Sequence, residues 1–328
     1  MVARPVLRVT TLVVANVAFG TIASAHGPGA AAVAPGGRLG ELGTAGEPWI
    51  LAALGFVAIA YVAGLARLWR ASARGRGVSR REAGAFAAGW LLLACALLGP
   101  LDAWSARSFA VHMTQHEALM LIAAPLLVRG RPLAVWSWAL SAGVRAATHR
   151  LLTRSAWRYV WRTFTRPLGA TALQLGVLFA WHLPAWFDRA VTHPGVHALQ
   201  HASFLAAALC FWWAVRAGAA ARSASRAASG IAVACVFVTM LATGALGALL
   251  TFAPVPWYRA YVDGAAWGLS ALEDQQLGGL LMWVPGGLAY LFAGLFHAAR
   301  IVGHEPPAAR TGASDASAPI HLVRRIVP

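Results

Sequence analysis

The chain alternates long apolar runs with short polar connections. Seven of the runs approach the roughly 20 residues that a helix needs to cross the hydrocarbon core of a bilayer. They lie at about residues 49–68, 84–101, 109–128, 168–187, 196–215, 230–252 and 277–298. Because a segment inside a bilayer has to satisfy its own backbone hydrogen bonds, we expect each run to be an α-helix. The pattern therefore predicts an all-α integral membrane protein, with a seven-transmembrane-helix bundle over residues 49–300.

The two ends of the chain depart from this pattern. Arg4 and Arg8 precede an apolar stretch and an Ala-Ser-Ala sequence at residues 23–25, which is typical of a cleavable signal peptide over residues 1–25. An uncleaved anchor, which would add one span, is the alternative. Residues 26–48 are rich in Gly, Pro and Ala and are predicted to form a flexible extracytoplasmic lead. Residues 301–328 are predicted to form a disordered cytoplasmic tail.

Composition agrees with a membrane location. Hydrophobic residues make up 59% of the chain, charged residues make up 12%, and the mean hydropathy is +0.62, which an ordinary soluble domain does not reach. The 27 basic residues are all arginines, and no nucleic-acid-binding motif accompanies them. We therefore expect the lipid bilayer, and no nucleic acid, to be a partner of this chain.

The arginines also predict the orientation of the bundle. One set of segments holds 21 arginines: the connections after the first, third and fifth predicted spans, counted with the adjoining span ends, and the segment after the seventh span. The lead and the remaining connections together hold four. Since cytoplasmic loops collect positive charge, the arginine-rich set faces the cytoplasm. The mature N-terminus is then outside and the C-terminus is cytoplasmic, as a cleaved signal peptide also requires. We expect a multi-pass protein of the bacterial plasma (inner) membrane.

Aromatic residues mark both predicted membrane surfaces. On the cytoplasmic side, arginines recur every four residues from Arg150 to Arg166, with aromatic residues between them. This spacing predicts an amphipathic helix on the anionic inner leaflet, and a helix that docks a partner is the alternative. On the outer side, an interfacial aromatic belt is predicted from Trp257, Tyr258, Tyr261 and Trp267.

Polar side chains interrupt the third apolar run. His112 and His116 lie four residues apart and therefore on one face of a helix, and His197 and His201 repeat that spacing in the fifth run. With the orientation above, both pairs lie at the outer end of the bundle together with His182. Ionisable groups inside a membrane mark functional sites or bond to neighbouring helices, and neutral imidazole is a ligand for first-row metals. We therefore predict a metal site made by these five histidines, with metal-free bonding between helices as the alternative.

Other residues are placed to support such a site. Cu(I) favours soft thioether ligands, and Met113 lies between the two histidines of the third run. Gln115 adds an amide to the same run. Glu273, Asp274 and Gln275 stand at the start of the seventh span, where acidic groups also suit a helix N-terminus.

No catalytic motif accompanies the histidines. His116-Glu117 begins like the zinc-protease sequence HExxH, but Met120 stands at the second ligand position. No P-loop, GxSxG or dinucleotide-binding glycine pattern occurs in a suitable context. The three cysteines lie in apolar runs without a CxxC pair and are predicted to be buried apolar residues. We expect no enzyme activity, while haem ligation by opposed histidines stays open.

Three segments carry a family resemblance. They read HMTQHEALMLIAAPLLVRGRP, WHLPAWFDRAVTHPGVHALQHASFLAAALCFWW and LGALLTFAPVPWYRAYVDGAAWGLSALEDQQLGGLLMWVPGG. Together they resemble the CtaG family of cytochrome c oxidase assembly proteins, a polytopic membrane family linked to caa-type oxidases. The combination of HMxQH, WHxP, HxxxH and LEDQQLxG is specific, and the resemblance covers about residues 49–300.

The resemblance implies a seven-helix plasma-membrane protein required for oxidase maturation at the stage of copper insertion. Its patterned positions in this sequence are His112, Gln115, His116, His182, His197, His201, Glu273, Asp274 and Gln275. The implied cargo is a copper ion, and the implied partners are cytochrome c oxidase subunits and a periplasmic copper chaperone. A copper permease resembling the CopD family, a haem-binding membrane redox protein and a metal-free scaffold are the alternatives.

Overall fold

The computed structural model describes residues 48–72, 77–220, 226–262 and 267–302. Within these residues the secondary structure is helical and contains no strand, as the apolar runs predict. The predicted signal peptide, the lead up to residue 47 and the tail from residue 303 lie outside the described residues.

Six helical segments of the described chain are long and apolar enough to cross a membrane. Two of them are composite: Phe109–Arg129 joins α5 (Phe109–Glu117), η2 (Ala118–Ala123) and α6 (Ala124–Arg129), and Ala271–Ile301 contains α14 (Ala271–Leu281), η4 (Met282–Gly286) and most of α15 (Gly287–Val302). The other four are α2 (Pro48–Ser72), α3 (Arg80–Leu98), α12 (Pro194–Ala220) and α13 (Arg226–Thr251). Each corresponds to one predicted apolar run.

The remaining run differs from its prediction. A continuous helix over residues 168–187 is wrong, because α10 (Pro167–Trp181) ends and α11 (Pro184–Thr192) begins after a bend of 75°. Pro184 lacks a backbone N–H and disfavours a helical conformation at the preceding residue, and Leu183 is extended, with ψ 127°. The described chain therefore has six candidate spans, or seven if this bent pair is one span.

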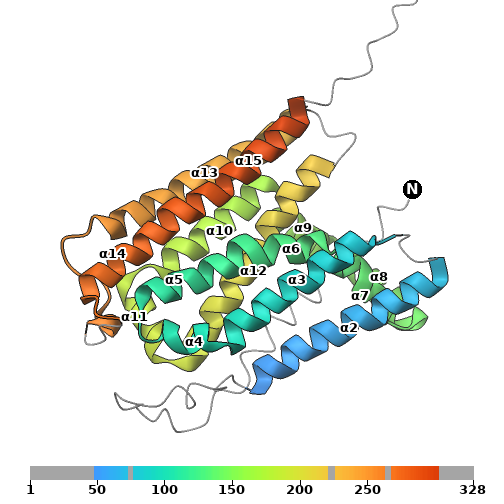
Figure 1. The fold of residues 1–328 in the computed structure, drawn as a ribbon. Coiled ribbons are helices and arrows are strands. Elements are labelled where there is room, and N and C mark those ends of the chain that lie inside the picture. The colour runs from blue at the N-terminus through green and yellow to red at the C-terminus, as the bar shows by residue number, and fades with distance from the viewer. Residues whose placement is uncertain (1–47, 73–76, 221–225, 263–266, 303–328) are drawn as a thin grey trace, which may run out of the picture.

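Short helices lie at the two ends of the bundle (Figure 1). One end carries α4 (Pro100–Ser105), α11 and η3 (Arg259–Tyr261), and the other carries α7 (Pro132–Ala139), α8 (Ala142–Leu152) and α9 (Ser155–Thr165). A single amphipathic helix through the arginine repeat is wrong, because Arg154 is extended, with ψ 144°, and separates α8 from α9. Helix α9 docks on the bundle through Trp161, which packs edge-on against Trp213 with ring centroids 5.9 Å apart.

The third span lies in the middle of the bundle (Figure 1). Met113 and Val128 face a core formed with α10, α12 and α13, whereas Leu119 and Leu127 face a second core formed with α2 and α3. Packing on both sides removes most of this span from lipid. Polar groups on this span are therefore buried in the protein interior, where they require hydrogen-bond partners or bound ions.

The cysteines divide between buried and exposed positions. Cys210 and Cys235 are buried and free, as predicted. The predicted burial of Cys95 is wrong, because it lies on the exposed face of α3.

A π-helical segment follows the histidine-bearing turns of the third span. In η2, the widened turn leaves the Met120 carbonyl to accept a hydrogen bond from the Trp212 indole at 2.8 Å, and the Gln174 amide contacts the Met120 sulfur at 3.6 Å. Such segments are frequent at functional sites.

Gly286 of η4 allows the last span to approach Glu117 of the third span closely. A Cβ atom on Gly286 would lie 2.5 Å from Glu117 Oε2.

Candidate metal centre

Four of the five predicted histidines converge between α5 and α12. The ring centroids of His112 and His116 on α5 lie 4.4 Å apart, and those of His197 and His201 on α12 lie 4.2 Å apart. Across the two helices, both the His112–His197 and the His116–His201 centroid distances are 5.2 Å. The two pairs of neighbouring helical turns therefore face each other, as their spacing predicts.

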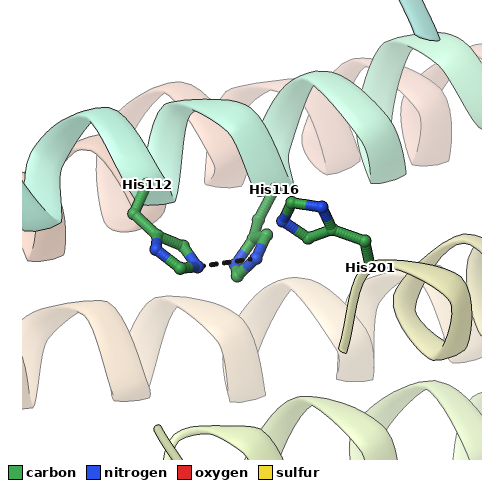
Figure 2. Close-up of side chains that lie close together, drawn as sticks. All are labelled: His112, His116 and His201. Carbon is green, nitrogen blue, oxygen red and sulfur yellow. Dashed lines mark hydrogen bonds between the residues drawn. The ribbon is translucent and has the colours of Figure 1, made fainter. Parts of the chain in front are cut away.

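Three of these imidazoles form a compact group. Each of His112, His116 and His201 is buried and offers a ring nitrogen, and the three nitrogens lie within 4.8 Å of one another. Figure 2 shows the first two rings descending side by side from α5 while His201 reaches toward them from α12. The Nε2 atoms of His112 and His116 are 3.1 Å apart. Two imidazoles bound tetrahedrally to one metal at about 2.0 Å place their nitrogens about 3.3 Å apart, so this separation suits a shared ion.

Tyr261 determines which nitrogen of His112 carries the proton. Its hydroxyl donates to the Ser105 carbonyl at 2.7 Å, so its oxygen is left to accept from His112 Nδ1–H at 2.9 Å. Burial raises the pKa of Tyr261 well above its ordinary value, with Asp274 and Asp188 adding to the effect, and the hydroxyl therefore keeps its proton. This assignment leaves a lone pair on His112 Nε2, which lies 3.1 Å from His116 Nε2 and 3.3 Å from Gln200 Oε1, and an unprotonated nitrogen is what metal ligation needs.

Four buried ring nitrogens of the five predicted histidines lack a hydrogen-bond partner among the described residues. They are His116 Nδ1, His182 Nε2, His197 Nε2 and His201 Nε2. Buried polar atoms are normally paired, and each unpaired one calls for an explanation such as an ion. Histidines that only bond between helices leave these atoms without partners, and His201, which carries one of them, belongs to the three-histidine group.

His182 lies beside the group and not within it. It follows the last turn of α10, where its Nδ1–H donates to the Leu178 carbonyl at 2.7 Å. Its ring is packed near Phe187 and Phe204, with centroid distances of 6.2 and 6.3 Å. The structure therefore buries His182 at the same end of the bundle but does not bring it into the group of three nitrogens.

Asp274 holds the start of the histidine-bearing helix. Its carboxylate accepts from the Ser108 hydroxyl at 2.7 Å, from Phe109 N–H at 2.6 Å and from Ala110 N–H at 3.2 Å. The two N–H groups belong to the first turn of α5 and have no acceptor within that helix, and a negative charge is also favourable at a helix N-terminus. Asp274 is therefore a positioning residue for the site, and it is not a member of the three-histidine group.

The other predicted supporting residues have local structural partners. Glu273 is exposed and forms a capping box with Ser270 at the start of α14. Gln275 is buried, and its Oε1 accepts from Trp257 N–H at 2.6 Å. Met113 is buried in the apolar core. Among the described residues, Glu273 belongs to neither group of candidate metal ligands.

Two contributors to the site are not predicted by the sequence. Asp102 in α4 lies with His197 and His201 in a second group of three candidate ligand atoms, also within 4.8 Å of one another. Tyr261, expected in a lipid-facing belt, is instead buried against His112. The available signal was position alone, since Asp102 shortly precedes the third predicted span and Tyr261 stands in the connection between the sixth and seventh.

A family model described as Cytochrome c oxidase caa3 assembly factor (Caa3_CtaG) matches residues 59–303. The chain belongs to this family. The match begins inside α2 and runs past the end of α15, so it contains every residue of the candidate centre. The resemblance found in the three sequence segments is confirmed. No curated protein and no solved structure matches the chain.

Proposed function

We propose that this protein assists the maturation of a cytochrome c oxidase by holding a copper ion at the outer end of its bundle and passing it to an oxidase subunit. The family assignment supports a role in oxidase assembly. The observation that carries the copper proposal is the convergence of His112, His116 and His201, whose ring nitrogens lie within 4.8 Å of one another inside the protein.

The chemistry of this group suits transient binding. Imidazole nitrogen is a good ligand for copper, and three protein ligands leave a coordination position open to a group from another molecule. An oxidase subunit presenting its own ligands can then take the ion by exchange. Only bonds between the metal and its ligands are exchanged, so the proposed role needs no enzyme activity.

The location of the group also fits this role. The arginine distribution supports a plasma-membrane protein with its mature N-terminus outside, its C-terminus in the cytoplasm and the histidines near the outer surface. Oxidase subunits in the same membrane are the proposed recipients, and a periplasmic copper chaperone is the proposed donor.

The proposal is tested with histidine variants in a strain that lacks the gene. His112→Ala and His201→Ala are expected to insert normally, to lower copper in the purified protein by at least tenfold and to reduce active oxidase. His193→Ala is the matched control, because His193 belongs to the same end of the bundle but is exposed and contacts Thr192. Unchanged copper content and oxidase activity in both site variants would contradict the proposal.

Copper transport across the membrane is a second candidate function. It is favoured by the polar groups that continue from the histidines along the third span. Glu117 Oε2 and Gln174 Oε1 are buried without a hydrogen-bond partner among the described residues, and Gln174 reaches Met120 one turn further along. Copper uptake into vesicles containing the purified protein would support transport, and binding without uptake would support the assembly role.

A further inference from the structure

His201 is common to two groups of candidate ligands. One group joins it to His112 and His116, and the other joins it to Asp102 and His197. In each group the three ligand atoms lie within 4.8 Å of one another. We infer that copper occupies two positions that share His201, an inner position with His112 and His116 and an outer position with Asp102 and His197. This inference rests on the proposed function.

The Asp102 carboxylate is held in place by α5, the helix that carries two of the three inner ligands. The Gln115 amide donates to Asp102 Oδ1 at 2.9 Å and to the Ala96 carbonyl at 2.7 Å. These two acceptors determine which end of the amide is the nitrogen. Gln115 lies one residue before His116, so the same turn of α5 presents an inner ligand and positions an outer one. Partners of this kind orient metal ligands and tune their affinity.

The two positions differ in exposure and in charge. All three inner residues are buried, whereas Asp102 and His197 are half-buried. No arginine forms an ion pair with Asp102 within the described part of the chain. The outer position is therefore less buried than the inner one and adds a negative charge that attracts a cation, whereas the inner position offers three buried nitrogen ligands.

A shared ligand gives the ion a continuous route between the two positions. The bond to His201 is kept while the bonds to His112 and His116 break and bonds to His197 and Asp102 form. No electron is transferred, and the copper keeps its oxidation state. The ion is never without protein ligands during the exchange, which avoids the cost of exposing a bare cation in an apolar interior.

The test measures how fast bound copper leaves the full-length protein. Wild-type protein in detergent is loaded with Cu(I), a chromogenic Cu(I) chelator is added, and the release rate is expressed per bound ion. Asp102→Asn is expected to slow release by at least tenfold, because the outer position loses its charged ligand. His197→Ala removes the other outer ligand and is expected to slow release similarly, so the inference stays testable if Asp102→Asn does not fold.

The matched control is Asp188→Asn. Asp188 is a carboxylate at the same end of the bundle whose Oδ1 accepts from Ala260 N–H at 3.0 Å, a bond that the amide oxygen of asparagine preserves. Its release rate is expected to equal that of the wild type. Wild-type release rates in both Asp102→Asn and His197→Ala, with copper still bound, would overturn the shared-ligand route and leave the proposed function standing. Absence of bound copper in the wild-type protein would overturn the proposed function itself.

Discussion

The Asp274 carboxylate on α14 accepts a hydrogen bond of 2.6 Å from Phe109 N–H, the first amide of α5. The two residues are 165 positions apart in the chain. This bond connects the last span to the start of the helix that presents His112 and His116. The position of both histidines along the bundle axis therefore depends on an acidic residue that does not contact them.

Replacing Asp274 with alanine is expected to destabilise the protein by about 2 kcal/mol, because the cap of α5 loses a charged acceptor. The apparent Tm in detergent should fall, and copper retention should fall with it as the histidine turns lose their anchor. Glu273→Ala is the matched control, since Glu273 is exposed and caps only its own helix, and a smaller loss of stability is expected. Equal losses of stability in the two variants would show that the bond from Asp274 to α5 contributes no more than an ordinary helix cap.

Tyr261→Phe is expected to weaken copper binding by about tenfold, because removal of the hydroxyl frees His112 to change its tautomer and rotate. A competition titration against a Cu(I) chelator measures this affinity. Tyr258→Phe provides the comparison: its hydroxyl donates to the His182 backbone carbonyl at 3.1 Å and to no ring nitrogen. That variant should lose stability of about 1 kcal/mol but keep its copper affinity. The role assigned to Tyr261 fails if both variants bind copper as the wild type does.

Gly286→Ala is expected to lower the apparent Tm, because its Cβ would lie 2.5 Å from the Glu117 carboxylate and force that side chain to move. A Cβ on the neighbouring Gly287 would meet no atom within 4 Å. Gly287→Ala should therefore be neutral or stabilising by up to about 1 kcal/mol, since alanine favours a helix. Thermal unfolding of the pair measures the difference, and an equal Tm would mean that Glu117 moves without cost.

Copper itself is expected to stabilise the folded protein. At a free concentration 100 times the Kd, a ligand that binds only the folded state contributes about 2.7 kcal/mol. The apparent Tm of the wild type should therefore rise with added Cu(I) and return when a chelator removes it. His116→Ala should show a smaller rise, because it removes an inner ligand and leaves only the outer position with Asp102, His197 and His201. A rise of the same size in that variant would place the bound copper elsewhere in the protein.

The positions of the spans were predictable because few backbone structures can cross a bilayer. A segment such as α13 has to be apolar along its whole length and helical to satisfy its backbone, so its sequence alone identifies it. The break in the helix after Trp181 was harder to predict from the sequence. Proline is tolerated in membrane helices when neighbouring groups satisfy the freed backbone, so Pro184 did not by itself decide between a kink and an end.

The histidine pairs were predictable for a similar reason, since a separation of four residues places two side chains on one helical face. The contribution of Asp102 was not, because it depends on how α4 folds back between two spans. The role of Tyr261 was also hidden, since a tyrosine at a membrane surface and a tyrosine bonded to a buried imidazole have the same sequence signature. Contacts between distant segments decide such cases.

The order of synthesis gives the Tyr261 and Asp274 contacts a further meaning. His112, His116 and His201 are all made before either residue leaves the ribosome, so a nascent chain already contains the three imidazoles while the hydroxyl that selects the His112 tautomer and the carboxylate that anchors α5 are still missing. The centre reaches its final geometry only when the last span has been inserted. Under the proposed function, copper capture would be tied to insertion of this span, and an incomplete translation product would be a poor competitor for the ion.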